Sequence, residues 1–353
     1  MKKLIALIMV LAMVLSMAAC GGSETTTDEP AGDAALKAAC ILGVGGLGDQ
    51  GYNDLIYAGM ERAKAELGID FDYAEPKQVT DFEQIMRDMS NSGEYCVIVC
   101  VGFDQMDALM TVAPDYPEQN YAFIDGFIDA DNIVNYTCRE QEGSFLVGAM
   151  AALMKADAAT YGLADNGSIG FVGAMENDTI LRFAAGYDAG AKYINPDIQI
   201  LKTFVGAWDN PLEGKNHTLA KYDAGADIVM NVASGTGVGV LEGAKEAGKY
   251  AIGVDLNQDY DQPGSILTSM VKRVDTACYS VIKEVVDGTF AGNTVSYLDV
   301  AGKGVSLTDF AAIKEALGDK FPEEIITKLA EIEAKIVSGE IVVPNYEGFG
   351  PQK

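Results

Sequence analysis

The sequence is poor in the residues that many enzymes and nucleic-acid-binding proteins depend on. Its 353 residues include a single histidine, His217, and 25 Lys and Arg against 52 Asp and Glu, a formal net charge of −27. Binding to a phosphate backbone requires clustered basic side chains, so this composition argues against nucleic acid as a partner. Ser/His/Asp or Cys/His catalysis would have to use His217, which lies in an amphipathic stretch and is expected to be an exposed helical residue.

Several catalytic and cofactor motifs are missing as well. There is no GxxxxGK[ST] phosphate loop, no HExxH and no CxxC, so we expect neither a metal site nor a cofactor. The segment SGTGVG supplies Gly235 and Gly237, but a dinucleotide loop would need a third glycine where Val240 stands. We interpret it as a strand-to-helix turn whose backbone N–H groups face a polar ligand. The composition does not exclude a hydrolase that uses paired carboxylates, since acidic residues are abundant.

The cysteines do not form a disulfide pattern. Five follow Cys20, an odd number, and Cys96 and Cys100 lie in one apolar run expected to be a strand. Four residues of strand span about 13 Å, which is too far for these two to pair. We favour free thiols packed as small apolar side chains over structural disulfides.

The first twenty residues have the pattern of an export signal. Two lysines precede the apolar run from Leu4 to Met17, which is short for a membrane span of about 20 residues, and small residues lead to Cys20. This pattern resembles the bacterial lipobox, although Met17 replaces the usual leucine. An ordinary cleavage site is the alternative. We predict a signal peptide at 1–19 and lipidation of Cys20, which would hold the protein on the extracytoplasmic face of the cell membrane.

Residues 20–35 are expected to be a lipidated cysteine and a flexible tether. The stretch from Gly21 to Ala35 has no large apolar residue, so it cannot bury enough surface to offset its ordering entropy. Removal of residues 1–19 takes away two lysines and no acid, which changes the net charge from −27 to −29.

The remaining residues, about 318, alternate between two periodicities. Short apolar runs rich in β-branched residues alternate with amphipathic stretches of helical spacing, which predicts an α/β fold of parallel sheets covered by helices. The expected strands include 39–44, 96–101, 168–172, 227–232 and 250–254, and the expected helices include 54–67, 81–90, 142–154, 180–194 and 237–247. A folded chain of this length is longer than one hydrophobic core usually organises, which favours two lobes.

Two such series can be separated along the chain. We expect residues 36–140 and about 256–290 to form lobe 1, and residues from about 141 to 255 and 291–353 to form lobe 2. The elements after residue 254 could belong to either lobe. Repeated crossing between lobes would make a hinge of several strands, beside a cleft that can close.

Polar and aromatic side chains follow several expected strands, where a ligand would be met at the mouth of a cleft. Asp49 and Asn53 lie in GDQGYND after the first strand, and could equally be helix caps. Asp125 and Asp255 each follow a strand directly, and Trp208, the single tryptophan, lies beyond another in GAWDNP.

These segments resemble the basic membrane protein family, also called PnrA-like, of ABC transporter substrate-binding lipoproteins. The matching segments occur in the family's order and include GDQGYNDLIYAGM, IGFVGAMENDTILRFAAGYDAGAKYINPDIQI, FVGAWDNPLEGK and SMVKRVD. The resemblance implies a type I periplasmic-binding-protein fold, with two doubly wound parallel-sheet lobes joined by a multi-strand hinge. It also implies a purine nucleoside as ligand, and a permease with its ATPase as partners.

The resemblance further implies a set of ligand-binding residues. Tyr57 and Trp208 would stack on the base from opposite lobes. The polar groups would be Asp49, Asn53 and Asp125 at the edge of the base, Asp255 and Lys272 at the ribose, and Gly235 and Thr236 along the cleft.

Several residues differ from the family pattern or have a second interpretation. The sequence departs from the family pattern at Gln50, Gly51 and Tyr52, and Asp255 with Lys272 could instead be a structural ion pair. The alternatives are a receptor for a sugar or another small polar metabolite, an exported nucleoside hydrolase with paired carboxylates, and a ligand-free adhesin or signalling lipoprotein. A solute receptor needs no cofactor and no catalytic group.

Overall fold

A computed structural model describes residues 36–164, 167–318, 321 and 323–346. The expected signal peptide, Cys20 and the tether lie outside the described residues. Within the described part of the chain, none of the helices combines the length and apolar character needed to cross a membrane.

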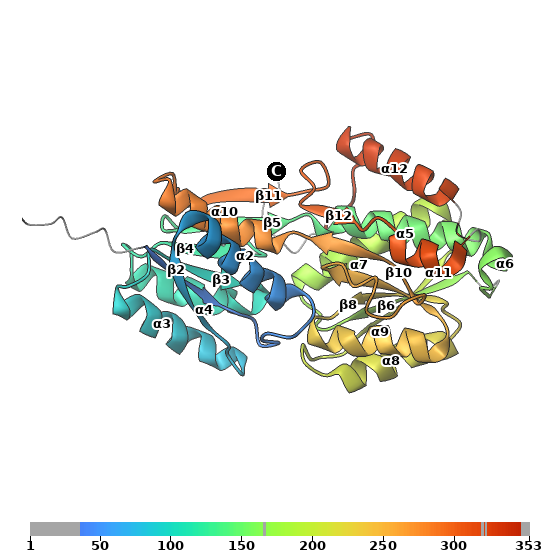
Figure 1. Cartoon of the computed structure of the whole chain (residues 1–353), viewed down its shortest axis with the longest axis horizontal. Coiled ribbons are helices and arrows are strands. Elements are labelled where there is room, and N and C mark those ends of the chain that lie inside the picture. The colour runs from blue at the N-terminus through green and yellow to red at the C-terminus, as the bar shows by residue number, and fades with distance from the viewer. Residues whose placement is uncertain (1–35, 165–166, 319–320, 322, 347–353) are drawn as a thin grey trace, which may run out of the picture. The chain divides into compact units, whose positions relative to one another are not determined.

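The described chain forms two six-stranded sheets with helices packed against them (Figure 1). The first series of elements is β1 (Lys37–Ile41), α2 (Tyr52–Leu67), β2 (Asp70–Ala74), α3 (Phe82–Ser92), β3 (Val97–Val101), α4 (Met106–Val112), β4 (Tyr121–Ile124) and β5 (Ile133–Cys138). The second series is α5 (Glu140–Ala156), α6 (Ala158–Tyr161), β6 (Ser168–Gly173), α7 (Asp178–Ile194), β7 (Gln199–Phe204), α8 (Pro211–Asp223), β8 (Ile228–Val232), α9 (Gly235–Ala247), β9 (Tyr250–Asp255) and β10 (Ile266–Lys272). The last elements are α10 (Val274–Val286), β11 (Thr294–Leu298), β12 (Val305–Leu307), α11 (Ala311–Leu317) and α12 (Glu323–Val337). The expected alternation of strand and helix is confirmed.

Both sheets have the same strand order. The first sheet runs β11-β5-β4-β3-β1-β2 and the second runs β12-β10-β9-β8-β6-β7, so β4 corresponds to β9 and β5 to β10. All pairings are parallel except that of β10 with β12. Consequently Asp125, which follows β4, and Asp255, which ends β9, occupy equivalent places in the two lobes.

The chain crosses between the sheets three times within the described residues. The crossings follow β5, β10 and β11, and they lie side by side because Arg139 N–H donates to Leu298 O at 2.8 Å and Arg273 N–H to Gly304 O at 2.9 Å. The expected lobe boundaries are therefore wrong for two strands. β10 pairs within the second sheet, although 256–290 was expected in lobe 1, and β11 pairs within the first, although 291–353 was expected in lobe 2.

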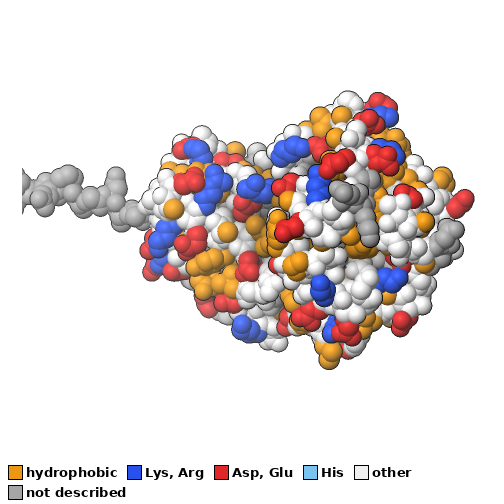
Figure 2. All heavy atoms as spheres, turned by 45° about the vertical axis from the view of Figure 1, so that its right-hand side comes forward, with side chains coloured by type: hydrophobic (Ala, Val, Ile, Leu, Met, Phe, Trp, Pro, Cys, Tyr) orange, Lys and Arg blue, Asp and Glu red, His pale blue; other side chains and the backbone are white. Residues whose placement is uncertain are grey.

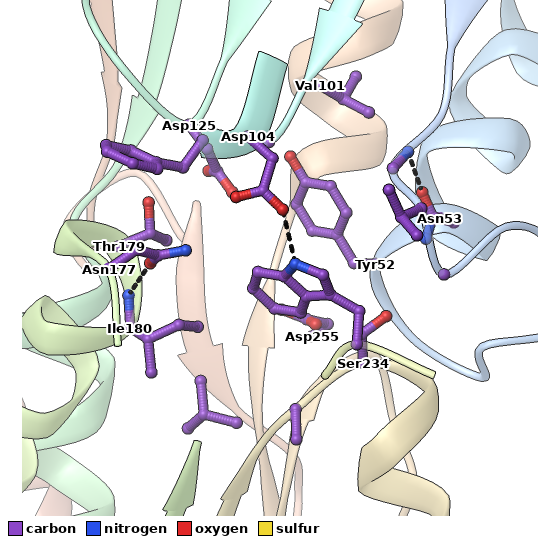
Figure 3. A pocket seen from close by; sticks show the side chains of 18 of the residues that line it. Tyr52, Asn53, Val101, Asp104, Asp125, Asn177, Thr179, Ile180, Ser234 and Asp255 are labelled. Atoms are coloured by element: carbon purple, nitrogen blue, oxygen red, sulfur yellow. Dashed lines mark hydrogen bonds between the residues drawn. The ribbon is translucent and has the colours of Figure 1, made fainter. Parts of the chain in front are cut away.

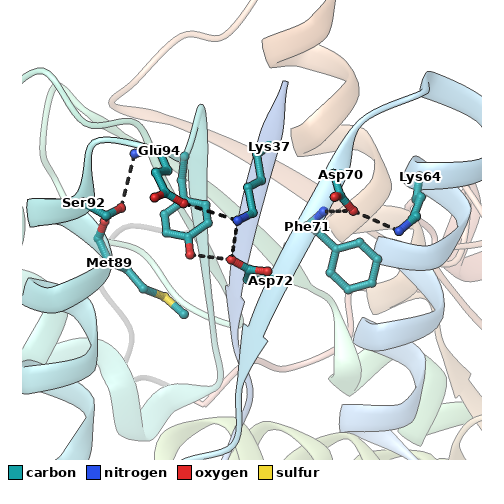
Figure 4. A network of polar contacts seen from close by, with 9 residues as sticks. Lys37, Lys64, Asp70, Phe71, Asp72, Met89, Ser92 and Glu94 are labelled. Atoms are coloured by element: carbon teal, nitrogen blue, oxygen red, sulfur yellow. Dashed lines mark hydrogen bonds and ion pairs between the residues drawn. The ribbon is translucent and has the colours of Figure 1, made fainter. Parts of the chain in front are cut away.

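The distribution of surface charge and the state of the cysteines are as expected from the sequence. Figure 2 shows acidic side chains spread over the visible face with Lys and Arg among them, and no basic stripe there. A polar network at the start of β1 is typical of this surface: Lys37 pairs with Asp72 at 2.7 Å and Glu94 at 3.3 Å (Figure 4). Such exposed pairs contribute about 0–1 kcal/mol each.

The five described cysteines are free thiols, and four of them are buried.

Helices α5 and α7 pack closely because glycines remove side chains from their interface. A Cβ built on Gly190 would lie 1.9 Å from the carbonyl oxygen of Phe145, and one on Gly186 would lie 2.2 Å from that of Gln141. These backbones can approach only while both positions lack a side chain. The close contact fixes α7 against α5, and thereby the position of the first turn of α7 at the cleft.

We expect Gly190→Ala to destabilise the protein by about 1–3 kcal/mol or more, because overpacking forces the two helices apart. The matched control is Gly243→Ala on α9, where the new Cβ would lie 3.3 Å from the Thr218 side chain. There the better helix propensity of alanine, about 1 kcal/mol, offsets the tight contact. Urea unfolding of both variants checks this, and equal losses would contradict it.

Candidate functional site

A cavity lies between the two lobes, at the carboxyl ends of the strands (Figure 3). Five aromatic side chains line it: Tyr52, Phe82 and Phe103 from the first lobe, and Phe183 and Trp208 from the second. The polar side chains that line it are Asn53, Asp104, Asp125, Asn177, Thr179, Ser234, Asp255 and Lys272. A concave site with apolar walls and a few convergent polar groups is the usual form of a small-molecule site.

Five of the nine residues expected to bind a ligand line this cavity, and four do not. Those that do are Asn53, Asp125, Trp208, Asp255 and Lys272. Those that do not are Asp49, Tyr57, Gly235 and Thr236.

Asp49 lies directly behind the cavity wall and organises it. Its carboxylate accepts hydrogen bonds from the backbone N–H groups of Gly51 and Asn53 and from the Asn53 side-chain amide, at 2.9 to 3.0 Å. It also accepts a hydrogen bond of 2.8 Å from the Ser234 hydroxyl of the other lobe. Asp49 therefore holds the start of α2 and joins the lobes, and Asn53 is the member of this pair that reaches the cavity.

Tyr57 lies on the outer side of the first lobe and not in the cavity. Its ring makes edge contacts with Phe71 and Tyr73, at centroid distances of 5.7 and 5.2 Å. The helix α2 starts at Tyr52, so Tyr57 is turned about 140° around the helix axis from it. The aromatic ring that α2 directs into the cavity is Tyr52. Burial, with Asp125 as the next cause, raises the pKa of Tyr52 well above its ordinary value, so it keeps its proton.

Gly235 and Thr236 support the loop that carries Trp208. The Thr236 N–H donates to the carbonyl oxygen of Trp208 at 2.9 Å, and its hydroxyl donates to that of Ala207 at 2.8 Å. A Cβ on Gly235 would lie 3.2 Å from the Trp208 carbonyl oxygen, so a side chain there would press on the same loop. Both residues thus position the tryptophan from behind the cavity.

Trp208 reaches across the cleft to the first lobe. Its indole N–H donates to Oδ2 of Asp104 at 2.6 Å, as Figure 3 shows. Burial raises the pKa of Asp104, and the hydrogen bond from Trp208 opposes that rise. Asp104 stands in the turn after β3, and we had not singled it out in the sequence.

A buried cluster of four charged groups lies where the chain crosses between the lobes. The Lys272 ammonium is 2.6 Å from Asp125 and 3.0 Å from Glu140, whose other oxygen is 2.9 Å from Nε of Arg182. All four side chains are at most 4% exposed. Burial acts to lower the pKa of Lys272, but the carboxylates of Asp125 and Glu140 outweigh it and raise that pKa above its ordinary value.

The same cluster contains the one group of ligand-type atoms with metal-site spacing found among the described residues. Oxygen atoms of Asp125 and Glu140 and the sulfur of Cys138 lie within 4.8 Å of one another. The Lys272 ammonium already pairs with both carboxylates, so it takes the place that a cation would need. This arrangement is a charge cluster rather than a metal site.

Asp255 lines the cavity and forms no ion pair with the described residues. Its pKa is raised to about 7, with burial as the largest cause; Lys272 opposes the rise, and the carboxylates of Asp49, Asp125 and Glu140 add to it. The Asp255 backbone is also unusual, with φ +68°. Asp125 has φ +85°, and Gln50 and Ser234, also at the cleft, have positive φ. Such strained residues persist where the surrounding structure fixes them, which is common at functional sites.

Four buried polar atoms at the cavity have no hydrogen-bond partner among the described residues. They are the hydroxyl oxygen of Tyr52, Oδ1 of Asp125, Nδ2 of Asn177 and Oγ1 of Thr179. Leaving a buried donor or acceptor unpaired costs about 1–3 kcal/mol. A bound molecule that pairs with these atoms would remove that cost, so the cavity is equipped for a polar ligand.

The family model for PnrA-like ABC transporter substrate-binding proteins matches residues 36–347. The chain belongs to this family. It is 34% identical to an uncharacterised lipoprotein of Pyrococcus abyssi, over 95% of this chain and 90% of that one. It is 28% identical to the ABC transporter nucleoside-binding protein BmpA of Lactococcus lactis, over 95% of this chain and 96% of the relative.

Among solved structures, this PnrA-like protein is similar to a solute-binding protein of an ABC transporter system from Aeropyrum pernix. The TM-score is 0.80 and the identity 32%, over 88% of this chain and 94% of the other. The expected type I fold with two lobes is confirmed. The family consists of ABC transporter substrate-binding proteins.

Asp255 gives this PnrA-like protein a testable pH dependence. A carboxyl whose pKa is raised by folding makes the folded state progressively less stable as pH rises from about 4 to about 7, and the loss is complete above that. We expect Asp255→Asn to raise the free energy of unfolding at pH 8 and to have much less effect at pH 4.5. Denaturant unfolding at both pH values measures this, with the exposed Asp197→Asn as control. An equal effect at both pH values would contradict it.

The single tryptophan allows the contact between Asp104 and Trp208 to be followed directly. We expect Asp104→Ala to shift Trp208 emission to longer wavelength and to increase its quenching by acrylamide, because the ring loses its anchor on the first lobe. Asp104→Asn keeps an acceptor oxygen and should change both less. Asp107→Ala, an exposed site on α4, is the control. Unchanged emission and quenching in Asp104→Ala would show that this contact does not hold the ring.

Proposed function

We propose that this protein captures a purine nucleoside between its two lobes and delivers it to the permease of an ABC importer. The observation that carries the proposal is the composition of the cavity. Aromatic rings from both lobes surround buried polar atoms that lack partners within the described chain. A nucleoside offers a flat base for the rings and hydroxyl and ring groups for the polar atoms.

The aromatic walls suit a base, although not through the pair expected from the sequence. Trp208 remains the ring from the second lobe, and Tyr52 replaces Tyr57 as the ring from α2. Phe103 and Phe183 add apolar surface on the two sides. Offset or edge contacts between such rings and a base contribute beyond the area they bury.

The charges of the cavity favour a neutral ligand over a phosphorylated one. Three lining carboxyl groups belong to Asp104, Asp125 and Asp255, whereas the lining ammonium of Lys272 is already paired with Asp125 and Glu140. A phosphate would meet these acids, and the described residues that line the cavity offer it no unpaired cation. The ribose hydroxyls of a nucleoside can donate to carboxylates at no such cost.

Export and anchoring form part of the same proposal. Cys20 and the tether to Ala35 would keep the binding lobes near the membrane, on its outer side, where a permease is within reach. Lobe closure around the ligand would give the permease a shape that differs from the empty form. The name of the Lactococcus lactis relative, a nucleoside-binding protein, supports the choice of ligand.

The direct test is calorimetric titration with adenosine, guanosine and inosine. The protein should first be unfolded and refolded to remove any ligand carried over from the cells. We expect binding of at least one nucleoside at one site per chain, and much weaker binding of adenosine 5′-monophosphate because of the cavity carboxylates.

Two further measurements separate this proposal from its alternatives. Chromatography of nucleoside incubated with the protein should return it intact, whereas a hydrolase would release free base. Binding of sugars without nucleosides would favour a receptor for another metabolite. The absence of heat and of any thermal shift with all three nucleosides would overturn the proposed function.

A further inference from the structure

The first turn of α7 presents hydrogen-bond donors to the cavity. Asn177 caps this 17-residue helix, because its side-chain oxygen accepts the backbone N–H of Ile180 at 3.1 Å. That bond fixes which way the amide faces, and Figure 3 shows its nitrogen directed toward the cavity. Nδ2 is buried and has no hydrogen-bond partner among the described residues.

Thr179 adds a second group at the same place. Its side chain lines the cavity, the residue is 6% exposed, and its hydroxyl also makes no hydrogen bond with the described residues. The N-terminus of a helix carries a partial positive charge and favours groups that accept hydrogen bonds. The amide, the hydroxyl and the helix terminus therefore all suit an acceptor atom of the ligand.

The surrounding charges decide which kind of acceptor fits. An anion is disfavoured, because Asp104, Asp125 and Asp255 line the same cavity. A carbonyl oxygen is uncharged and has two lone pairs, so it can accept from both the Asn177 amide and the Thr179 hydroxyl. From the other lobe, the unpaired Oδ1 of Asp125 supplies an acceptor for a donor on the ligand.

We propose that the first turn of α7 recognises the carbonyl oxygen of a 6-oxopurine base, and that Asn177 determines specificity for hypoxanthine or guanine nucleosides over adenosine. In these bases a ring N–H adjoins the carbonyl, and Asp125 accepts it. Adenine instead places an amino donor opposite the Asn177 amide nitrogen, which can only donate, although the Thr179 hydroxyl could accept from it. This inference rests on the proposed function and specifies its ligand.

Asn177→Asp tests the assignment with little change in shape. The variant keeps the oxygen that caps α7 and replaces the amide donor with an oxygen that can only accept. We expect its affinity for inosine to fall about 10- to 100-fold, because a buried hydrogen bond is replaced by a repulsive contact. Adenosine should lose much less, since its amino group can donate to the new carboxylate. Wild type should bind inosine more tightly than adenosine.

Two other variants complete the experiment. Asn210→Asp is the matched control, because Asn210 caps α8 in the same way, through the backbone N–H of Glu213 at 3.2 Å, and does not line the cavity. It should leave all affinities unchanged. Thr179→Val removes the hydroxyl at constant shape and should weaken inosine more than adenosine, which keeps the test valid if Asn177→Asp fails to fold.

The outcomes are distinguishable. Unchanged inosine affinity in both Asn177→Asp and Thr179→Val, or equal losses for inosine and adenosine, would overturn the assignment while leaving the proposed function intact. A wild-type preference for adenosine would also overturn it. If wild type binds no nucleoside at all, the proposed function fails and the inference fails with it.

Discussion

The rest of the molecule depends on one buried ammonium group, that of Lys272. It lies at the end of β10, where the chain leaves the second lobe, and it pairs with Asp125 of the first lobe and with Glu140 at the start of α5. Glu140 in turn holds Arg182 of α7. Removing one partner from such a buried set would leave an uncompensated charge, which costs about 3–5 kcal/mol. The cluster therefore fixes the position of two crossing segments, those after β5 and β10, and of the helix α7 that borders the cavity. Its charges balance internally, so Lys272 only partly opposes the rise in the pKa of Asp255 that burial causes.

The contacts at the mouth of the cleft are of a different kind. The lobes meet there through hydrogen bonds of Ser234 to Asp49, Gln258 to the Gln50 carbonyl, and Trp208 to Asp104. Such hydrogen bonds contribute about 1–3 kcal/mol each, the larger values being for the carboxylate acceptors, and they can be exchanged for water or for a ligand if the lobes separate. Breaking the buried charge cluster at the crossings costs more free energy than breaking the hydrogen bonds at the mouth of the cleft. A hinge that is rigid at its base and loosely held at its mouth allows closure without rearrangement of either lobe.

Much of this architecture follows from the sequence, and the departures have identifiable causes. The alternating periodicities predict two parallel sheets, and the rule that residues after strands face a ligand correctly places Asp125, Asp255 and Trp208 at the cavity. The same rule, applied to the turns after β3 and β6, would have found Asp104 and Asn177. Tyr57 came from the family resemblance, and it lies outside the cavity because α2 begins at Tyr52, which turns Tyr57 toward Phe71 and Tyr73. The lobe membership of β10 and β11 depends on which sheet edge each strand reaches, which local sequence does not encode. Whether Asn53, Asp125, Trp208, Asp255 and Lys272 contact a ligand stays a prediction.

The equal strand order of the two sheets has a consequence for how a ligand can lie. Each lobe places an aspartate at the equivalent position, Asp125 after β4 and Asp255 at the end of β9. These two acids by themselves would not distinguish one lobe from the other. The next strands break this equivalence, because β5 ends in Cys138 where β10 ends in Lys272. Lys272 lines the cavity and pairs with Asp125 and Glu140, whereas Cys138 does not line it. The two walls of the cavity are therefore related by strand order but differ in their polar side chains, so a bound molecule should have one preferred orientation.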